Sequence, residues 1–136
     1  MAEKLMLEVV TPQKAVVSET VNSVVAPGTE GEFGALKGHT TFLTSLKVGT
    51  LKYTDVSGKE KLLFVNGGFA EVLPDKVTIL AESAERQQDI DVVRAQAAKE
   101  RAEQRLANRA AGIDLLRAEL ALRRALHRLK VAQYAK

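Results

Sequence analysis

The sequence predicts an α+β fold in which an antiparallel β-sandwich of about eight to ten short strands precedes an antiparallel two-helix hairpin. Residues 1–85 contain all three prolines and eight of the nine glycines, whereas residues 86–136 contain no proline and twelve alanines. The charge divides at the same place, with 8 basic and 11 acidic side chains (−3) before it and 12 basic and 6 acidic (+6) after it. We therefore expect a β domain over residues 1–86 and a helical arm over residues 87–136.

Short runs rich in valine, threonine and phenylalanine indicate the strands. The first, residues 6–10, ends before Pro12, because the residue preceding a proline is pushed towards extended or turn geometry. Residues 31–39 carry three glycines and predict a bent corner, and tight turns are expected at residues 56–59 and 74–75. The remaining strands are expected at residues 16–17, 21–25, 43–46, 50–54, 62–65, 69–73 and 77–80.

The periodicity becomes helical after Asp89. Either Asp89 or Asp91 can cap the first helix, because a carboxylate there accepts from free backbone N–H groups of the first turn. This helix is expected from Ile90 to about Arg109, and Gly112 is expected to break it and to act as a hinge.

A second helix is expected from about Asp114 to Ala132. Its apolar residues recur at steps of three and four, which gives one stripe: Leu115, Ala118, Leu122, Ala125, Leu129 and Ala132. The first helix offers mainly alanines to this stripe. An alanine methyl contributes about 0.8 kcal/mol of apolar burial against roughly 1.5–3 for a leucine. The contact between the two helices, called the seam below, is therefore weak, whereas each helix has a high intrinsic propensity to form. We therefore expect a movable arm.

Several classes of protein are excluded or disfavoured by composition. The chain has no cysteine, which excludes disulfides, thiolate catalysis and zinc–sulfur sites, and fits an intracellular setting. No phosphate-loop motif, metal-ligand spacing or nucleophile–base pair is present, so we expect no catalytic residue and no metal site, and a small hydrolase is the disfavoured enzyme alternative. Neither a signal peptide nor an apolar run of about 20 residues occurs, so no insertion into a membrane is expected.

Arginines recur on one face of each expected helix. Such a run usually marks a solvated face, but guanidinium groups gathered on one side more often have an anionic partner. Nucleic acid is the alternative partner; the near absence of aromatic side chains for base stacking disfavours it. The two sets are Arg94, Arg101 and Arg105, and Arg117, Arg124 and Arg128.

Six segments, in order and at matching spacing over essentially the whole chain, resemble the epsilon subunits of rotary F-type ATP synthases. They are Val10-Thr11-Pro12, Gly31-Glu32-Phe33-Gly34, Gly38-His39, Gly67-Gly68-Phe69-x-Glu71-Val72, Val77-Thr78-Ile79-Leu80-Ala81 and Asp89-Ile90-Asp91. The resemblance implies a ten-stranded N-terminal β-sandwich, a C-terminal helical hairpin and a non-catalytic place on the central rotor. It also implies a role in coupling rotation to ATP synthesis and in restraining ATP hydrolysis through the arm.

The same resemblance implies partners and their contact residues. Glu32 is expected to face the ring of membrane c subunits, and His39 to lie near the gamma subunit. The extended arm is expected to meet the alpha and beta catalytic subunits at the cytoplasmic face of a bacterial membrane. Its inhibitory contacts would come from Arg117, Arg123, Arg124 and Arg128.

Bacterial epsilon subunits that bind ATP on the hairpin share a further motif with this chain, Ile90-Asp91-x-x-Arg94-Ala95. By position their additional contacts fall on Glu85, Arg101, Arg124 and Arg128. The resemblance thus implies a regulatory ATP, bound with magnesium, and no obligatory cofactor. Arginines can pair with phosphate oxygens through forked donors. A helix cap at Asp91 and a solvent-exposed Arg94 would give the same sequence motif. Nucleotide binding and helix capping therefore both stay open as interpretations.

Overall fold

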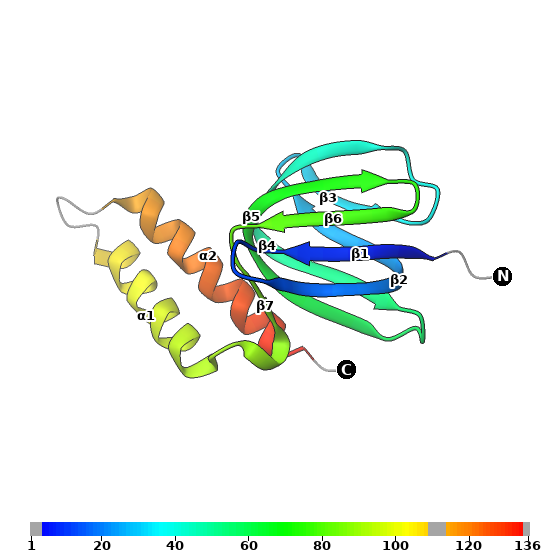
Figure 1. The fold of residues 1–136 in the computed structure, drawn as a ribbon. Helices are drawn as coiled ribbons and strands as arrows, with labels where there is room; N and C mark the ends of the chain where they lie inside the picture. Colours follow the sequence, from blue (N-terminus) through cyan, green and yellow to red (C-terminus); the bar gives the residue numbers. More distant parts are fainter. Residues whose placement is uncertain (1–3, 109–113, 135–136) are drawn as a thin grey trace.

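The computed structural model describes residues 4–108 and 114–134, which form a β domain with a two-helix arm beside it (Figure 1). The strands are β1 (Leu5–Val10), β2 (Ala15–Gly28), β3 (Gly31–Ala35), β4 (Phe42–Asp55), β5 (Glu60–Leu73), β6 (Lys76–Ala81) and β7 (Ala84–Arg86). A short 3-10 helix, Gln87–Asp89, leads into α1 (Val92–Asn108), and α2 (Leu115–Ala132) follows.

The sheet closes on itself. The ladder runs β1-β6-β5-β4-β2, and β1 also pairs with β2, so five strands complete a barrel. β3 extends the sheet from β2, and β7 pairs with β5. All pairs are antiparallel except β1–β6, which is parallel from the Met6–Lys76 pair to the Val10–Leu80 pair. The expectation of a wholly antiparallel sandwich is therefore wrong at this one pair. Because the ring of five strands is closed, it does not have the two edge strands that an open sheet has.

The expectation of about ten strands is also wrong, because six expected strands are halves of three long ones. β2, β4 and β5 each run for 14 residues. Gly67 and Gly68 lie between the strands expected at residues 62–65 and 69–73, but both are inside β5, with φ of 73° and 126°. This left-handed backbone, which glycine adopts at little cost, bends β5 without breaking its ladder to β4.

The corner expected at residues 31–39 is strand over its first half. β3 occupies Gly31–Ala35, and positive φ values at Gly31 (129°) and Gly38 (87°) place bends near the two ends of the expected corner. The turns expected at residues 56–59 and 74–75 are confirmed.

Alternation of side chains builds the barrel core. In β1, Leu5, Leu7 and Val9 are buried while Met6 points outward, as the period of two of a strand requires. Leu51 and Ile79 from other strands are fully buried in the same cluster.

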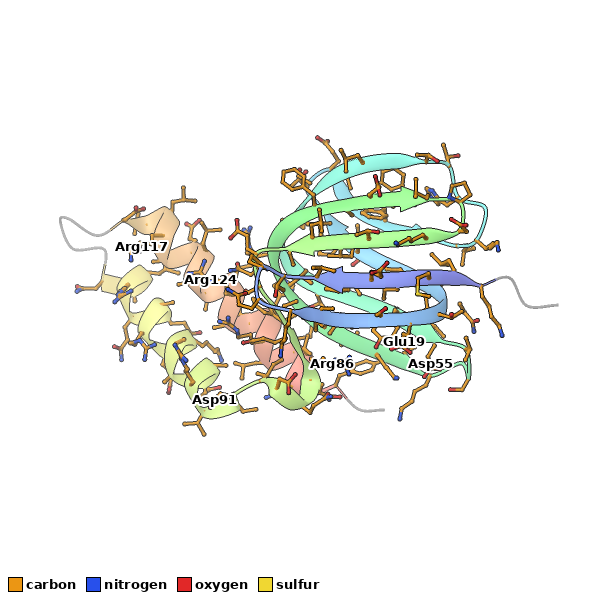
Figure 2. The ribbon with its side chains drawn as sticks, in the orientation of Figure 1. Glu19, Asp55, Arg86, Asp91, Arg117 and Arg124 are labelled. Carbon is orange, nitrogen blue, oxygen red and sulfur yellow. The ribbon has the colours of Figure 1, made fainter. Side chains whose placement is uncertain are left out.

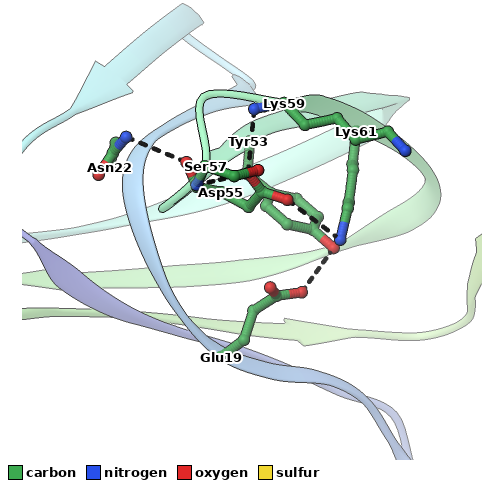
Figure 3. A network of polar contacts seen from close by, with 7 residues as sticks. All are labelled: Glu19, Asn22, Tyr53, Asp55, Ser57, Lys59 and Lys61. Atoms are coloured by element: carbon green, nitrogen blue, oxygen red, sulfur yellow. Dashed lines mark hydrogen bonds and ion pairs between the residues drawn. The ribbon is translucent and has the colours of Figure 1, made fainter. Parts of the chain in front are cut away.

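The β4–β5 turn is tied by the side chain of Asp55 (Figure 3). Its Oδ1 accepts from the Ser57 hydroxyl at 2.6 Å and from the backbone N–H groups of Ser57 and Lys59 at 3.0 and 2.9 Å. These donors, together with Lys61, lower the pKa of Asp55 to about 2. Beside it, burial and the Glu19 carboxylate raise the pKa of Tyr53, whose hydroxyl donates to Glu19 at 2.9 Å. The turn thus fixes the register in which β4 meets β5.

The arm has the two helices expected. α1 begins at Val92 rather than at Ile90, because Asp91 is its cap and accepts from the N–H of Arg94 at 3.0 Å. Asp114 caps α2 through the N–H of Arg117 at 3.1 Å. The most buried residues of the seam are alanines, as expected: Ala95, Ala102, Ala118 and Ala125.

Candidate functional site

A groove of about 450 Å³ opens between α1 and α2 where the chain leaves the barrel. Its wall combines four guanidinium groups, three carboxylates and three alanines, so it can pair with an anion and still accept donors from the same ligand. The lining residues are Glu85, Asp89, Asp91, Arg94, Ala95, Ala98, Arg101, Ala121, Arg124 and Arg128.

The spacing of residues along α1 decides which of its side chains line the groove. Arg94 and Arg101 are seven residues apart, so both lie on the same face, two turns from each other. Ala95 is 3% exposed and lets the two helices approach closely. Asp91, directly before α1, uses Oδ1 for the cap; Figure 2 shows it at the beginning of that helix and Arg124 on α2. The cap and the groove therefore share one carboxylate.

The α2 wall is joined to the barrel through Arg128. Its Nε lies 2.8 Å from Oε1 of Glu85 on β7, and its guanidinium lies 4.5 Å from the ring centroid of Phe64 on β5. The Arg128 and Glu85 side chains are 30% and 33% exposed, so solvent partly screens this pair. An anion in the groove would meet an arginine that the barrel already positions.

The groove brings together seven of the eight residues expected to contact a nucleotide. The exception is Ile90, which is 8% exposed and packs with Leu62, Phe64 and Val131 beneath the arm. Three residues that line the groove were not predicted: Asp89, Ala98 and Ala121. Ala98 lies one turn after Ala95, and Ala121 one turn before Arg124, so helical spacing from the predicted residues could have found them.

The other expected contact residues lie away from the groove. Glu32 is exposed on β3. His39 follows β3; its Nδ1 lies 2.7 Å from the carbonyl oxygen of Thr40, and its ring centroid lies 5.1 Å from that of Phe42. Arg117 and Arg123 are exposed on α2. Gly112, the expected hinge, lies outside the described residues.

α2 makes most of the arm's contacts with the barrel. Val131 and Phe64 are fully buried in this junction. The Tyr134 hydroxyl donates to Oε1 of Glu60 at 2.6 Å, and the Gln87 side chain donates to the carbonyl oxygen of Tyr134 at 2.8 Å. α1 packs against α2. The arm therefore rests on the barrel mainly through α2 and the residues next to it, by a small set of contacts.

The sequence matches two family descriptions that divide the chain. Residues 4–87 match "ATP synthase, Delta/Epsilon chain, beta-sandwich domain", and residues 88–133 match "ATP synthase, Delta/Epsilon chain, long alpha-helix domain". The ATP synthase epsilon chain of Desulforapulum autotrophicum is 66% identical over 133 residues, which cover 98% of each chain. The epsilon chain of Syntrophobacter fumaroxidans is 56% identical over 133 residues, again 98% of each.

The chain belongs to the ATP synthase delta/epsilon family. As an epsilon chain it is a non-catalytic central-stalk subunit of F-type ATP synthase, as the resemblance in the sequence implied. A chain in the Euglena gracilis mitochondrial ATP synthase, described as OSCP/F1/c-ring in rotational state 1, has a similar structure. Its TM-score is 0.81 at 25% identity, with 98% of this chain and 83% of that chain covered. Neither helix of this epsilon chain, within residues 4–108 and 114–134, is long and apolar enough to cross a membrane.

Proposed function

We propose that this epsilon chain couples rotation to ATP synthesis through its barrel and restrains ATP hydrolysis through an arm that ATP holds closed. The observation that carries the proposal is the groove, whose charged walls come from α1, α2 and β7. A ligand that contacts all three elements binds only the folded arm. By mass action it therefore stabilises that state against any extended one.

The phosphates of ATP fit the basic part of the groove. Arg94, Arg101, Arg124 and Arg128 place forked donors on both helices, which suits phosphate oxygens better than a single point charge would. Glu85 and Asp89 can accept from amino or hydroxyl groups of the adenosine. Magnesium would accompany the nucleotide as its phosphate-bound ion.

The weak attachment of the arm supports its movement. Release breaks the Arg128–Glu85 pair, the Tyr134–Glu60 hydrogen bond and the apolar contact of Val131 with Phe64. Once opened, the roughly 45 residues from Ile90 would span about 65 Å at 1.5 Å per residue, enough to run along a stalk between catalytic subunits. There, exposed arginines such as Arg117 and Arg123 would meet acidic surfaces of the alpha and beta subunits and resist rotation.

The barrel is proposed to dock on the rotor, with Glu32 towards the c-ring and His39 near gamma. Its outer surface supports this, because Leu43, Phe69 and Leu80 are 71%, 56% and 55% exposed. Phe69 and Leu80 are direct partners across the β5–β6 ladder, so they form one apolar surface. Through these contacts the chain would sit peripherally, at the cytoplasmic face of a bacterial membrane.

Calorimetry with magnesium and ATP on the isolated chain tests the groove. Arg94→Ala and Arg124→Ala should each weaken binding ten- to hundredfold, since a charge-assisted contact contributes about 1.5–3 kcal/mol. Arg105→Ala is the matched control, because this arginine lies on α1 but does not line the groove. An absence of heat at millimolar ATP, or equal losses in all three variants, would contradict a nucleotide site here.

The restraint on hydrolysis is tested in the assembled enzyme. Deletion of residues 89–136 should raise its rate of ATP hydrolysis and leave ATP synthesis in place, because the barrel keeps the rotor contacts. An unchanged rate of hydrolysis would show that the arm does not inhibit, and would leave the calorimetric result standing.

A further inference from the structure

His127 lies in the junction that holds α2 on the barrel. Its Nδ1 is 2.9 Å from Oγ1 of Thr50 on β4, and this hydrogen bond joins residues 77 positions apart. The side chain is half-buried, and α2 contacts both β4 and β5 around it. The imidazole is thus a titratable group that becomes more exposed when α2 leaves the barrel.

The charged groups that act on His127 are cations. Lys47 belongs to β4, and Arg123 and Lys130 belong to α2 itself. Burial first, then the charges of Lys130, Arg123 and Lys47, lower the pKa of His127.

Carboxylates at the junction have other partners. Glu60 of β5 accepts from Tyr134, and Glu85 of β7 accepts from Arg128. On the α1 side of α2, the groove holds Asp91 together with Arg94. A proton on His127 would therefore add a fourth positive charge in a partly desolvated place.

We propose that His127 is a proton-sensitive latch whose neutral imidazole permits α2 to dock on β4 and whose protonation releases the arm. With its proton on Nε2, the neutral ring accepts from the Thr50 hydroxyl at Nδ1. The protonated ring donates through the same atom, so the hydrogen bond persists with its direction reversed. Release is therefore driven by the buried charge and its cationic neighbours, not by loss of that bond. The latch rests on the proposed function only in requiring that the arm can move.

The direction of the pH dependence follows from linkage. The docked histidine has a pKa below its ordinary value of about 6.5, and the released histidine returns towards that value. The released state therefore binds more protons. Docking is complete above about pH 6.5 and weakens as the pH falls from there to the docked pKa. Each unit of difference between the two pKa values weakens docking tenfold. Acidification would thus raise the population of the extended, inhibitory conformation of the arm.

Energy transfer on the isolated full chain tests the latch, and imidazole NMR follows the protonation of His127. The chain has two histidines and no cysteine, so imidazole NMR gives two signals and introduced cysteines are unique. In the His39→Gln variant His127 is the single remaining histidine, so its NMR signal is identified directly. Fluorophores on Val56→Cys and Glu119→Cys, both exposed positions, report the distance between the barrel and α2 by energy transfer.

Energy transfer in the parent chain should fall between about pH 7.5 and 5.5, a range that brackets the ordinary histidine pKa. His127→Gln stays neutral and should hold α2 docked throughout, whereas His127→Lys carries a permanent charge and should be released already at pH 7.5. The latch is overturned if the parent shows no change, if His127→Gln releases over the same range, or if His127→Lys stays docked. Neither nucleotide nor catalytic subunits are present, so these outcomes do not depend on ATP binding or on inhibition.

Discussion

The barrel and the arm are stabilised by different kinds of side chain. The barrel core consists mainly of leucine, valine and isoleucine from five strands, with Leu7, Leu51 and Ile79 fully buried. The seam of the arm is built mainly from alanines such as Ala102 and Ala118. Each buried leucine contributes roughly two to four times the apolar stabilisation of an alanine methyl. Under the proposed function, this difference would let the barrel stay docked while the arm changes state.

The largest effect is expected in the barrel. Leu51→Ala removes a fully buried side chain and leaves a cavity, which should lower the free energy of unfolding by about 2–5 kcal/mol. Thermal melting followed by circular dichroism measures this. Leu80→Ala is the control, because Leu80 is 55% exposed on β6 and its loss should change the free energy of unfolding by less than about 0.5 kcal/mol. Equal losses from both would contradict a core centred on Leu51.

A smaller and local effect is expected at the junction. Val131→Ala removes two methyl groups from a fully buried position of α2, which should weaken docking by about 1.5 kcal/mol. Amide hydrogen exchange should then speed up about tenfold in α2 and stay unchanged in the barrel strands. Leu126→Ala on the same helix is the control, since Leu126 is 46% exposed. If exchange quickened equally in barrel and arm, the two regions would unfold together.

Local signals in the sequence predicted the local parts of this structure. The change of composition near residue 86, the two helices and the Asp91 cap all depend on neighbours within a few positions. The fusion of short strands into β2, β4 and β5 depends on how far each strand bends. The parallel β1–β6 pair joins segments about 70 residues apart. No periodicity reports such pairings, because they are decided by closure of the whole sheet.

In the candidate site, too, the local features were predicted and the long-range contacts were not. Its arginines were identified by resemblance and by helical spacing, and the groove does contain them. The attachment of Arg128 to Phe64 and Glu85, like that of His127 to Thr50, joins the arm to strands far away in the sequence. These contacts depend on how α2 lies on the barrel, which the sequence pattern did not predict.

The smallest effect separates the two roles of Asp91. Asp91 and Asp114 cap α1 and α2 through the same kind of bond, at 3.0 and 3.1 Å, but only Asp91 lines the groove. Without nucleotide, Asp91→Ala and Asp114→Ala should each destabilise the arm by about 1 kcal/mol, seen as faster amide exchange in the capped helix. With magnesium and ATP, the nucleotide should slow exchange in the Asp114→Ala arm and do so much less in the Asp91→Ala arm. If it protected both arms equally, Asp91 would act as a cap alone, and the acceptor for the nucleotide would have to be Glu85 or Asp89.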